Sequence, residues 1–313
     1  MRVLFIFLDG IGLGKNDPAT NPFARAAMPN LNALLDGRSL LKDSAPFYGE
    51  RATLLAIDPS VGVSGLPQSA TGQGILVTGI NIPAELGYHY GPKPNPEVAA
   101  FLNDRTLFSR LVAAEKKTAL LNAYPPRYFD GIDSGKRLYS SIPLAVTKAG
   151  LGLFRHEDLF AGRALSADFT GAGWRTMLGF PAAPTMDPPQ AGRKLVSLAM
   201  DYDFSLFEYW ASDYAGHKQQ METAVELMET FDDVLGGVVE EMIDERRKMR
   251  NDLLILITSD HGNMEDLSTR KHTDANVPMV VIGDKTAREQ FTRGMMDLTH
   301  VAPAIWKMVM ASE

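Results

Sequence analysis

Short apolar runs that end in polar turns recur along the chain, and they predict the strands of a sheet. The runs at 3–8 and 253–257 lack the alternation of a half-exposed strand, which is typical of strands buried on both faces of a parallel sheet. Further strands are predicted over residues 51–58, 117–123, 203–210 and 277–282. Apolar residues at helical spacing predict helices over residues 28–35, 101–114, 191–200, 219–249 and 299–310. The pattern predicts an α/β fold with a mostly parallel central sheet flanked by helices.

The pattern changes between residues 124 and 190, where proline, glycine, arginine and aromatic residues become frequent and buried runs disappear. We therefore expect this stretch to form a small, loop-rich cap inserted into a core made of residues 1–123 and 191–313. Its arginines would suit an anionic ligand, because Arg binds phosphate or carboxylate with two parallel hydrogen bonds. A surface loop is expected at 80–96, which is rich in glycine, proline and tyrosine.

Aspartate and histidine residues stand where several predicted strands end. Asp9 follows the first strand, Asp213 with His217 follows another, and Asp260 with His261 follows a third. Because ligands of open α/β sheets bind beyond the carboxyl ends of the strands, we expect these side chains to meet at that edge. Taken singly, each of them could instead be an ordinary turn residue.

A cluster of small and hydroxyl residues opens a predicted helix within 65–79. Ser69 or Thr71 would there lie beside the free N–H groups and the positive end of the helix, which together favour a bound anion. Either residue could alternatively serve only as the N-cap of the helix.

Three carboxylates and three histidines, His272 included, would repel one another or stay unpaired at one edge of a sheet unless a cation bound them. Mixed Asp and His ligation suits Zn²⁺ or Mn²⁺, with Mg²⁺ also possible, and the chain has no cysteine that could provide a thiolate ligand. Six such ligands and a hydroxyl suit two metal ions, which can stabilise both the attacking and the leaving oxygen of a phosphoryl displacement.

The composition argues against several other classes of protein. A net charge of -7 is unusual for a general nucleic-acid-binding protein. No apolar stretch approaches the roughly 20 residues that span a bilayer. The run at 3–8 is also too short for the core of a signal peptide. We therefore expect a cytoplasmic protein without a nucleic-acid or membrane partner; the sequence does not indicate an oligomeric state.

Five motifs occur along the chain in this order: FLDGIG, SATGQ, DYAGH, TSDHGN and KHTDANVP. Together they resemble the alkaline phosphatase superfamily, and most closely its branch of cofactor-independent phosphoglycerate mutases and phosphopentomutases. The resemblance covers both ends of the chain and leaves the middle unmatched. It implies an alkaline-phosphatase-like core and a phosphoryl-transfer enzyme with two divalent metal ions.

The resemblance also implies a role for each matched residue. The residues implied for one metal ion, shared with the nucleophile oxygen, are Asp9, Asp260 and His261. The residues implied for the other metal ion are Asp213, His217 and His272. Ser69 falls on the position of the nucleophile, with Thr71 as the alternative.

The chain departs from the mutases in two places. Gln73 stands where their motif has His, and the stretch 124–190 is shorter than their inserted domains. A short cap would close incompletely and let water accept the phosphoryl group. We therefore predict a phosphohydrolase, namely a phosphomonoesterase that acts through a phosphoserine on a small phosphorylated metabolite. A phosphomutase and a catalytically inactive metal-binding module are the alternatives.

Overall fold

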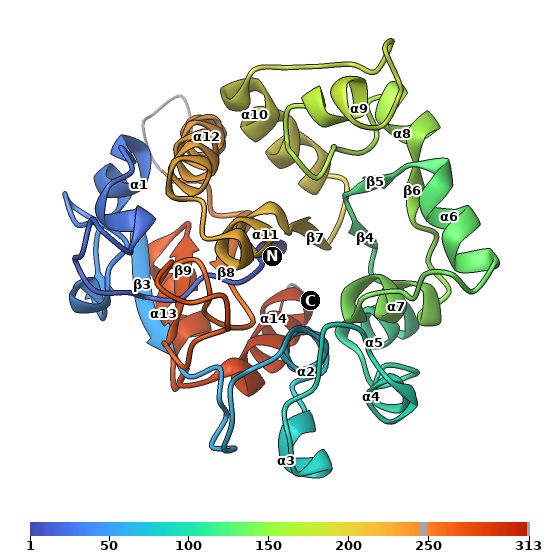
Figure 1. The fold of residues 1–313 in the computed structure, drawn as a ribbon, viewed down its shortest axis with the longest axis horizontal. Helices are drawn as coiled ribbons and strands as arrows, with labels where there is room; N and C mark the ends of the chain where they lie inside the picture. The colour runs from blue at the N-terminus through green and yellow to red at the C-terminus, as the bar shows by residue number, and fades with distance from the viewer. Residues whose placement is uncertain (244–248, 312–313) are drawn as a thin grey trace.

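The computed structural model describes residues 1–243 and 249–311, and a seven-stranded sheet runs through its centre (Figure 1). The strand order is β2-β3-β9-β8-β1-β7-β4. The strands are β1 (Arg2–Leu8), β2 (Phe47–Tyr48), β3 (Ala52–Ile57), β4 (Thr118–Leu120), β7 (Phe204–Tyr209), β8 (Leu253–Thr258) and β9 (Val277–Ile282). β8, β1, β7, β4 and β3 run in one direction, and β9 and β2 run in the other. The sheet is therefore mostly parallel, as predicted, but it is mixed towards its β2 edge.

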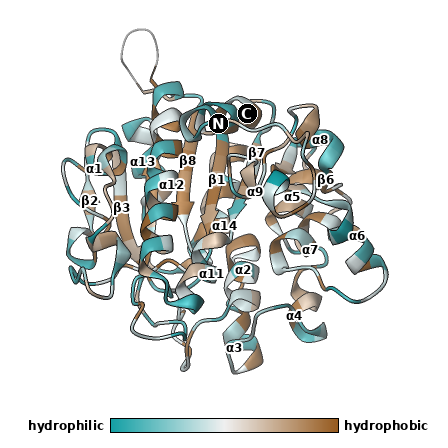
Figure 2. Cartoon of the chain, turned by 45° about the horizontal axis from the view of Figure 1, so that its top comes forward, coloured by the Kyte–Doolittle hydropathy of each residue, from teal (hydrophilic) through white to brown (hydrophobic). Residues whose placement is uncertain are grey.

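Helices cover both faces of this sheet. One face is covered by α1 (Pro29–Leu34), α10 (Pro188–Ala199) and α12 (Met221–Glu241). The other is covered by α2 (Ser69–Thr78), α5 (Leu107–Ala113), α7 (Ser141–Lys148), α13 (Lys285–Thr292) and α14 (Val301–Met310). Alternate residues of β1 enter the two cores, with Leu4, Ile6 and Leu8 on the first face and Val3, Phe5 and Phe7 on the second. Each such burial contributes roughly 1.5–3 kcal/mol, which explains why the central strands are mostly apolar (Figure 2).

The remaining short elements lie in the connections. They are η1 (Pro22–Ala24), η2 (Lys42–Ser44), α3 (Ile82–Leu86), α4 (Pro96–Phe101), α11 (Ala211–Lys218) and η3 (Leu298–His300). The loop expected at 80–96 thus contains a helical turn, which the side chain of Asn81 caps by accepting a hydrogen bond from the backbone N–H of Ala84. In the described part of the chain, no helix combines the length and the apolarity needed to cross a membrane.

Three predicted elements have other bounds in the structure. The helix expected at 101–114 starts only with α5, where Thr106 caps the helix by accepting a hydrogen bond from the backbone N–H of Ser109. The strand expected at 117–123 ends as β4, and the chain then forms β5 (Ala123–Tyr124) in a separate pair with β6 (Phe154–Arg155). The helix expected at 219–249 ends at Glu241, and part of its predicted end, 244–248, lies outside the described residues.

The stretch 124–190 is more helical than its composition predicts. Besides α7 it contains α6 (Pro126–Asp133), α8 (His156–Phe160) and α9 (Ala172–Thr176). α8 and α9 enclose a small apolar core around Trp174, whereas α7 joins the core of the main sheet. Turns and loops still make up much of the stretch, but its helices were not predicted, because helices of five to eight residues are too short for apolar periodicity to stand out. The division of the chain into a core and an inserted cap stays a prediction.

The contact between α10 and α12 yields a prediction about stability. A Cβ atom on Gly237 of α12 would lie 1.9 Å from the carbonyl oxygen of Pro189, and one on Gly192 would lie 2.0 Å from that of Val234. Gly237→Ala should therefore lower the free energy of unfolding by about 1–3 kcal/mol, although Ala favours helix more than Gly does. Ser197→Ala, at an exposed position of α10, is the control and should change it by less than about 0.5 kcal/mol. Urea unfolding measures both; an unchanged stability for Gly237→Ala would show that the helices separate freely.

Candidate metal centre

The first group of predicted ligands lies between the ends of β1 and β8 and the start of α2. The hydroxyl oxygen of Ser69, the first residue of α2, is 3.0 Å from Nε2 of His261. The same nitrogen lies 3.5 Å from Oδ1 of Asp9 and 3.5 Å from Oδ2 of Asp260. Phe7 pairs with Thr258 in parallel register, so Asp9 and Asp260, each two residues further on, reach the same edge of the sheet. This geometry brings three ligand atoms and a hydroxyl together.

The second group combines α11 with the loop that precedes β9. Asp213 and His217 lie one turn apart on α11, with 3.3 Å between Oδ2 and Nε2. Nε2 of His272 lies 3.3 Å from Nε2 of His217 and 3.8 Å from Oδ1 of Asp213. The other ring nitrogens face backbone carbonyls, Nδ1 of His272 at 2.8 Å from Pro67 and Nδ1 of His217 at 2.7 Å from Arg270. Such carbonyls select the tautomer that leaves Nε2 free to bind a metal ion.

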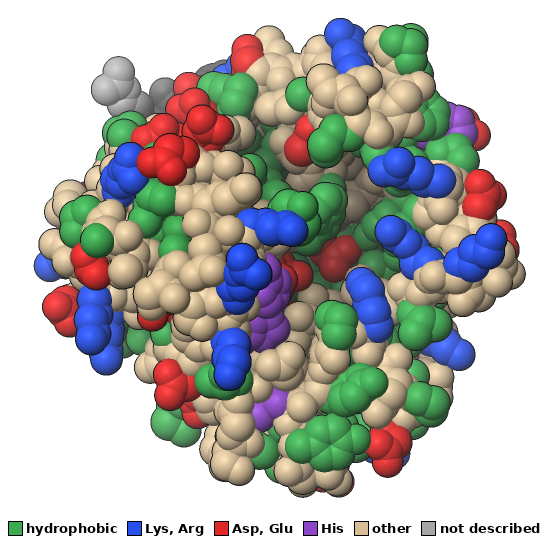
Figure 3. Space-filling view, viewed as in Figure 1, with side chains coloured by type: hydrophobic (Ala, Val, Ile, Leu, Met, Phe, Trp, Pro, Cys, Tyr) green, Lys and Arg blue, Asp and Glu red, His purple; other side chains and the backbone are tan. Residues whose placement is uncertain are grey.

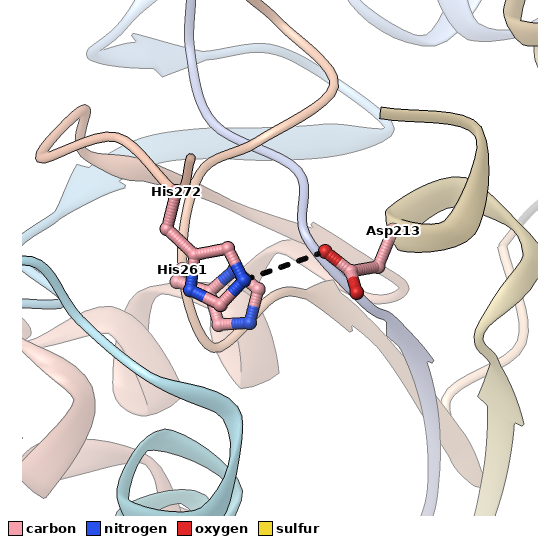
Figure 4. Close-up of side chains that lie close together, drawn as sticks. All are labelled: Asp213, His261 and His272. Carbon is pink, nitrogen blue, oxygen red and sulfur yellow. Dashed lines mark ion pairs between the residues drawn. The ribbon is translucent and has the colours of Figure 1, made fainter. Parts of the chain in front are cut away.

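The two groups adjoin each other. The rings of His261 and His272 stack with their centroids 3.7 Å apart and their planes 14° apart. Asp213 faces both rings (Figure 4). One of its carboxylate oxygens and one ring nitrogen of each histidine all lie within 4.8 Å of one another. The structure therefore brings all six predicted ligands and Ser69 into one continuous cluster.

Thr71, the alternative nucleophile, lies outside this cluster. Its hydroxyl donates to backbone carbonyl oxygens, that of Gln68 at 3.1 Å and that of Tyr90 at 3.3 Å. It also accepts a hydrogen bond from the backbone N–H of Tyr90. These contacts tie the loop before α4 to the first turn of α2, so the structure favours Ser69 for the role of nucleophile.

The electrostatics of the cluster suit bound cations. Burial, and then the charge of Asp260, raises the pKa of Asp9 well above its ordinary value, and burial together with Asp213 does the same to Asp260. Burial likewise holds the pKa of His261 well below its ordinary value. Oδ1 of Asp9 and Oδ2 of Asp260 are buried without a hydrogen-bond partner. Buried carboxylate oxygens of this kind need a positive partner, and a divalent ion bound by oxygen and nitrogen atoms provides one.

Close backbone approaches hold the ligands in place. A Cβ atom on Gly72 would lie 2.8 Å from Cβ of Asp260, so α2 rests directly on this ligand. A Cβ atom on Gly216 would lie 2.1 Å from Oδ1 of Asn263, so α11 leaves room for the Asn263 side chain. Both glycines are therefore needed to let helix and ligand loop meet.

The sequence patterns missed several residues that support the ligands. Asn263 donates from Nδ2 to Oδ1 of Asp213 at 3.0 Å, and Gln73 donates to Oδ2 of Asp9 at 3.5 Å. Glu265 accepts hydrogen bonds from the backbone N–H groups of Gly12 and Asn263, at 2.9 and 2.8 Å, and so joins the loops after β1 and β8. Asn263 and Gln73 lie within the motifs TSDHGN and SATGQ, so their position in these motifs was the one feature of the sequence that pointed to them.

Glu208 is a further missed residue, a charged side chain within the apolar strand β7. Burial raises its pKa to about 7, opposed by a hydrogen bond from the hydroxyl of Tyr124 and by the charge of Lys93. The Tyr124 hydroxyl lies 2.8 Å from Oε2 of Glu208. A single carboxylate within the otherwise largely apolar run FSLFEY could have pointed to Glu208 from the sequence.

A hollow opens on the face of the molecule drawn in Figure 3. Acidic side chains lie inside it, histidine side chains form part of its wall, and lysine and arginine side chains surround its mouth. An anionic ligand would therefore meet positive charge before it reached the carboxylates.

Residues 175–313 match the model of the Metalloenzyme superfamily, a range that includes five of the six predicted ligands. Curated relatives are 2,3-bisphosphoglycerate-independent phosphoglycerate mutases. The protein from Moorella thermoacetica is 24% identical over 49% of this chain and 30% of its own length. The one from Psychrobacter arcticus is 27% identical over 67% of this chain and 38% of its own length. The chain thus spans well under half the length of these relatives.

Solved structures share the fold over nearly the whole chain. Alkaline phosphatase from the Antarctic bacterium TAB5 aligns with a TM-score of 0.57 and 13% identity, covering 99% of this chain and 97% of that protein. The PH0037 protein from Pyrococcus horikoshii aligns with a TM-score of 0.55 and 16% identity, covering 100% and 97%. The resemblance that the five motifs predicted is confirmed: in sequence the chain is similar to the Metalloenzyme superfamily model and to phosphoglycerate mutases, and in fold it is similar to an alkaline phosphatase.

Proposed function

We propose that this chain is a phosphomonoesterase that uses two divalent metal ions and a serine nucleophile. The observation that carries the proposal is the joined cluster, in which two groups of Asp and His ligands meet at stacked rings beside the Ser69 hydroxyl. Asp9, Asp260 and His261 would hold one ion and Asp213, His217 and His272 the other. Two divalent ions bound there would lower the pKa of the Ser69 hydroxyl and offset the charge of the phosphoryl group.

The chain's own residues have three tasks in this reaction. Ser69 Oγ attacks phosphorus, the bond from phosphorus to the leaving alcohol breaks, and a phosphoserine forms. At the start of α2 the backbone N–H groups of Thr71 and Gly72 already donate to the carbonyl oxygens of Tyr90 and Gln68, so those of Ser69 and Ala70 would be the ones to donate to phosphoryl oxygens. Water then attacks the phosphoserine, which releases phosphate and restores the Ser69 hydroxyl.

A phosphomutase is the second candidate, because the curated relatives are phosphoglycerate mutases. Both reactions begin with the same phosphoserine, and they differ in whether water or a hydroxyl of the bound alcohol receives the phosphoryl group. The open hollow supports water as the acceptor, since a mutase must exclude water while the alcohol turns round. A metal-binding module without catalysis would share the ligands but turn over no ester.

The ligand geometry predicts about two divalent ions per chain, Zn²⁺ or Mn²⁺ being the best match to mixed Asp and His ligands. His272→Ala should remove about one ion and most of the activity, because Nε2 of His272 is implied in the second group. His156→Ala, which removes a histidine of α8, is the matched control and should change neither. Elemental analysis of the purified, Mn²⁺-soaked proteins measures the ions; wild-type protein that binds none would refute the proposal.

Ser69→Ala should abolish turnover of an aryl phosphate, by about 10³-fold or more, with metal content and thermal stability nearly unchanged. Thr71→Ala should retain turnover, because the Thr71 hydroxyl is bonded to backbone groups away from the ligands. A phosphoserine peptide that contains Ser69 should be detectable by mass spectrometry after acid quenching of wild type. Activity lost in Thr71→Ala and kept in Ser69→Ala would move the nucleophile to Thr71.

Product analysis in ¹⁸O-labelled water separates the two phosphoryl-transfer reactions. A phosphohydrolase releases inorganic phosphate that carries ¹⁸O, because water attacks phosphorus of the phosphoserine. A phosphomutase returns an isomer of the substrate without label. We expect labelled phosphate and little isomer from a phosphorylated metabolite, and unlabelled isomer as the main product would establish the mutase.

A further inference from the structure

A polar cluster outside the two groups of ligands continues the reactive edge of the sheet towards β4. It consists of Glu208 on β7, Tyr124 on β5, Tyr128 on α6 and Lys93 before α4. Glu208 pairs with Phe7 of β1 in parallel register, so its side chain emerges on the same face of the sheet as that of Asp9, two residues further along. Glu208 is thus offset from Asp9 by one strand across the sheet, roughly 4.8 Å, and by two residues along the strand, roughly 6.6 Å.

The carboxylate of Glu208 is fixed in position and only partly satisfied. Its backbone is held from both sides by Asn122, which accepts from the Glu208 N–H at 2.7 Å and donates to the Glu208 carbonyl at 2.9 Å. Tyr124 donates to Oε2 at 2.8 Å, and among the described residues no donor reaches Oε1. Glu208 is 8% exposed, so water or a bound ligand can still supply a donor to its carboxylate.

Two neighbouring groups also lack direct partners. The hydroxyl of Tyr128 is buried and has no hydrogen-bond partner among the described residues, although the charge of Glu208 acts on it. The ring centroids of Tyr128 and Tyr124 lie 4.5 Å apart. Lys93 is exposed at its outer side, and the charges of Glu208 and Asp9 act on it without an ion pair within the described chain. Glu208 and Lys93, whose charges act on each other and on Asp9, thus offer an acceptor and a cationic donor beside the first group of ligands.

We infer that Glu208 and Lys93 form a subsite that binds a hydroxyl group on the leaving alcohol of the phosphomonoester; the inference rests on the phosphohydrolase function proposed above. A hydroxyl can donate to Glu208 and accept from Lys93 at the same time. Because Glu208 and Lys93 carry opposite charges, a charged group would be attracted by one of them and repelled by the other, whereas a neutral hydroxyl can bond to both. An alkyl group without a hydroxyl would leave these buried polar groups without partners, so the site should bind it less tightly than an alcohol that carries the hydroxyl.

Two esters of the same chain length test the subsite: glycerol 1-phosphate and n-propyl phosphate, which lacks the hydroxyl groups. In the Mn²⁺-loaded protein, Glu208→Gln should lower kcat/KM for glycerol 1-phosphate about tenfold, mainly through KM, and change the value for propyl phosphate less than twofold. Lys93→Met, at a more exposed position, should act in the same direction. Glu226→Gln, at an exposed position of α12, is the control and should alter neither ester.

Equal loss for both esters in Glu208→Gln and Lys93→Met would overturn the subsite. A lower metal content in Glu208→Gln would also overturn the subsite, since that result would make Glu208 a metal ligand.

A second experiment separates this inference from the function on which it rests: calorimetry measures the binding of both esters to metal-loaded Ser69→Ala. Wild type that hydrolyses neither these esters nor the aryl phosphate refutes the phosphohydrolase. Tighter binding of glycerol 1-phosphate, lost on adding Glu208→Gln, would still support the subsite. Equal binding of the two esters refutes the subsite whether or not hydrolysis occurs.

Discussion

Mutual repulsion of buried carboxylates at one edge of the sheet is the constraint on which the site depends. The parallel pairing of β1 with β8 and β7 brings Asp9, Asp260 and α11 with Asp213 to the same edge, and burial there disfavours their charged forms. Packing of the apolar strands is what keeps these groups together. The packing of the sheet therefore holds together carboxylates that repel one another, and bound cations would remove this repulsion.

Rigid elements define the positions of the reactive groups. Ser69 is the first residue of α2, and Gly72 lets that helix rest directly on Asp260. Asp213 and His217 share one helix, which starts immediately after β7. The distance between nucleophile and ligands is thus set by backbone packing, and such positioning is what a site for charge stabilisation requires.

The sequence could predict that Asp9, Asp213 and Asp260 meet at one edge because each of them follows an apolar run, and the run locates the end of a strand. His272 precedes β9, so the pattern of strands alone did not locate it. The sequence could not predict the antiparallel direction of β9, since an apolar run has no polarity of its own and the connection alone decides. The helices of 124–190 escaped prediction because they are short. Glu208 escaped because its partners, Tyr124 and Lys93, are far from it in sequence and meet it only through the β4–β7 pairing.

The hydrogen bond between Ser69 and His261 joins residues 192 positions apart. Such a contact closes a very long loop, and loops of that length form late when a chain folds. Asp9 and His272 come from still more distant parts of the sequence, so no short segment of the chain contains a complete binding site. Ions would consequently load after the sheet has closed, and their binding free energy would then oppose unfolding of the whole sheet rather than of one loop.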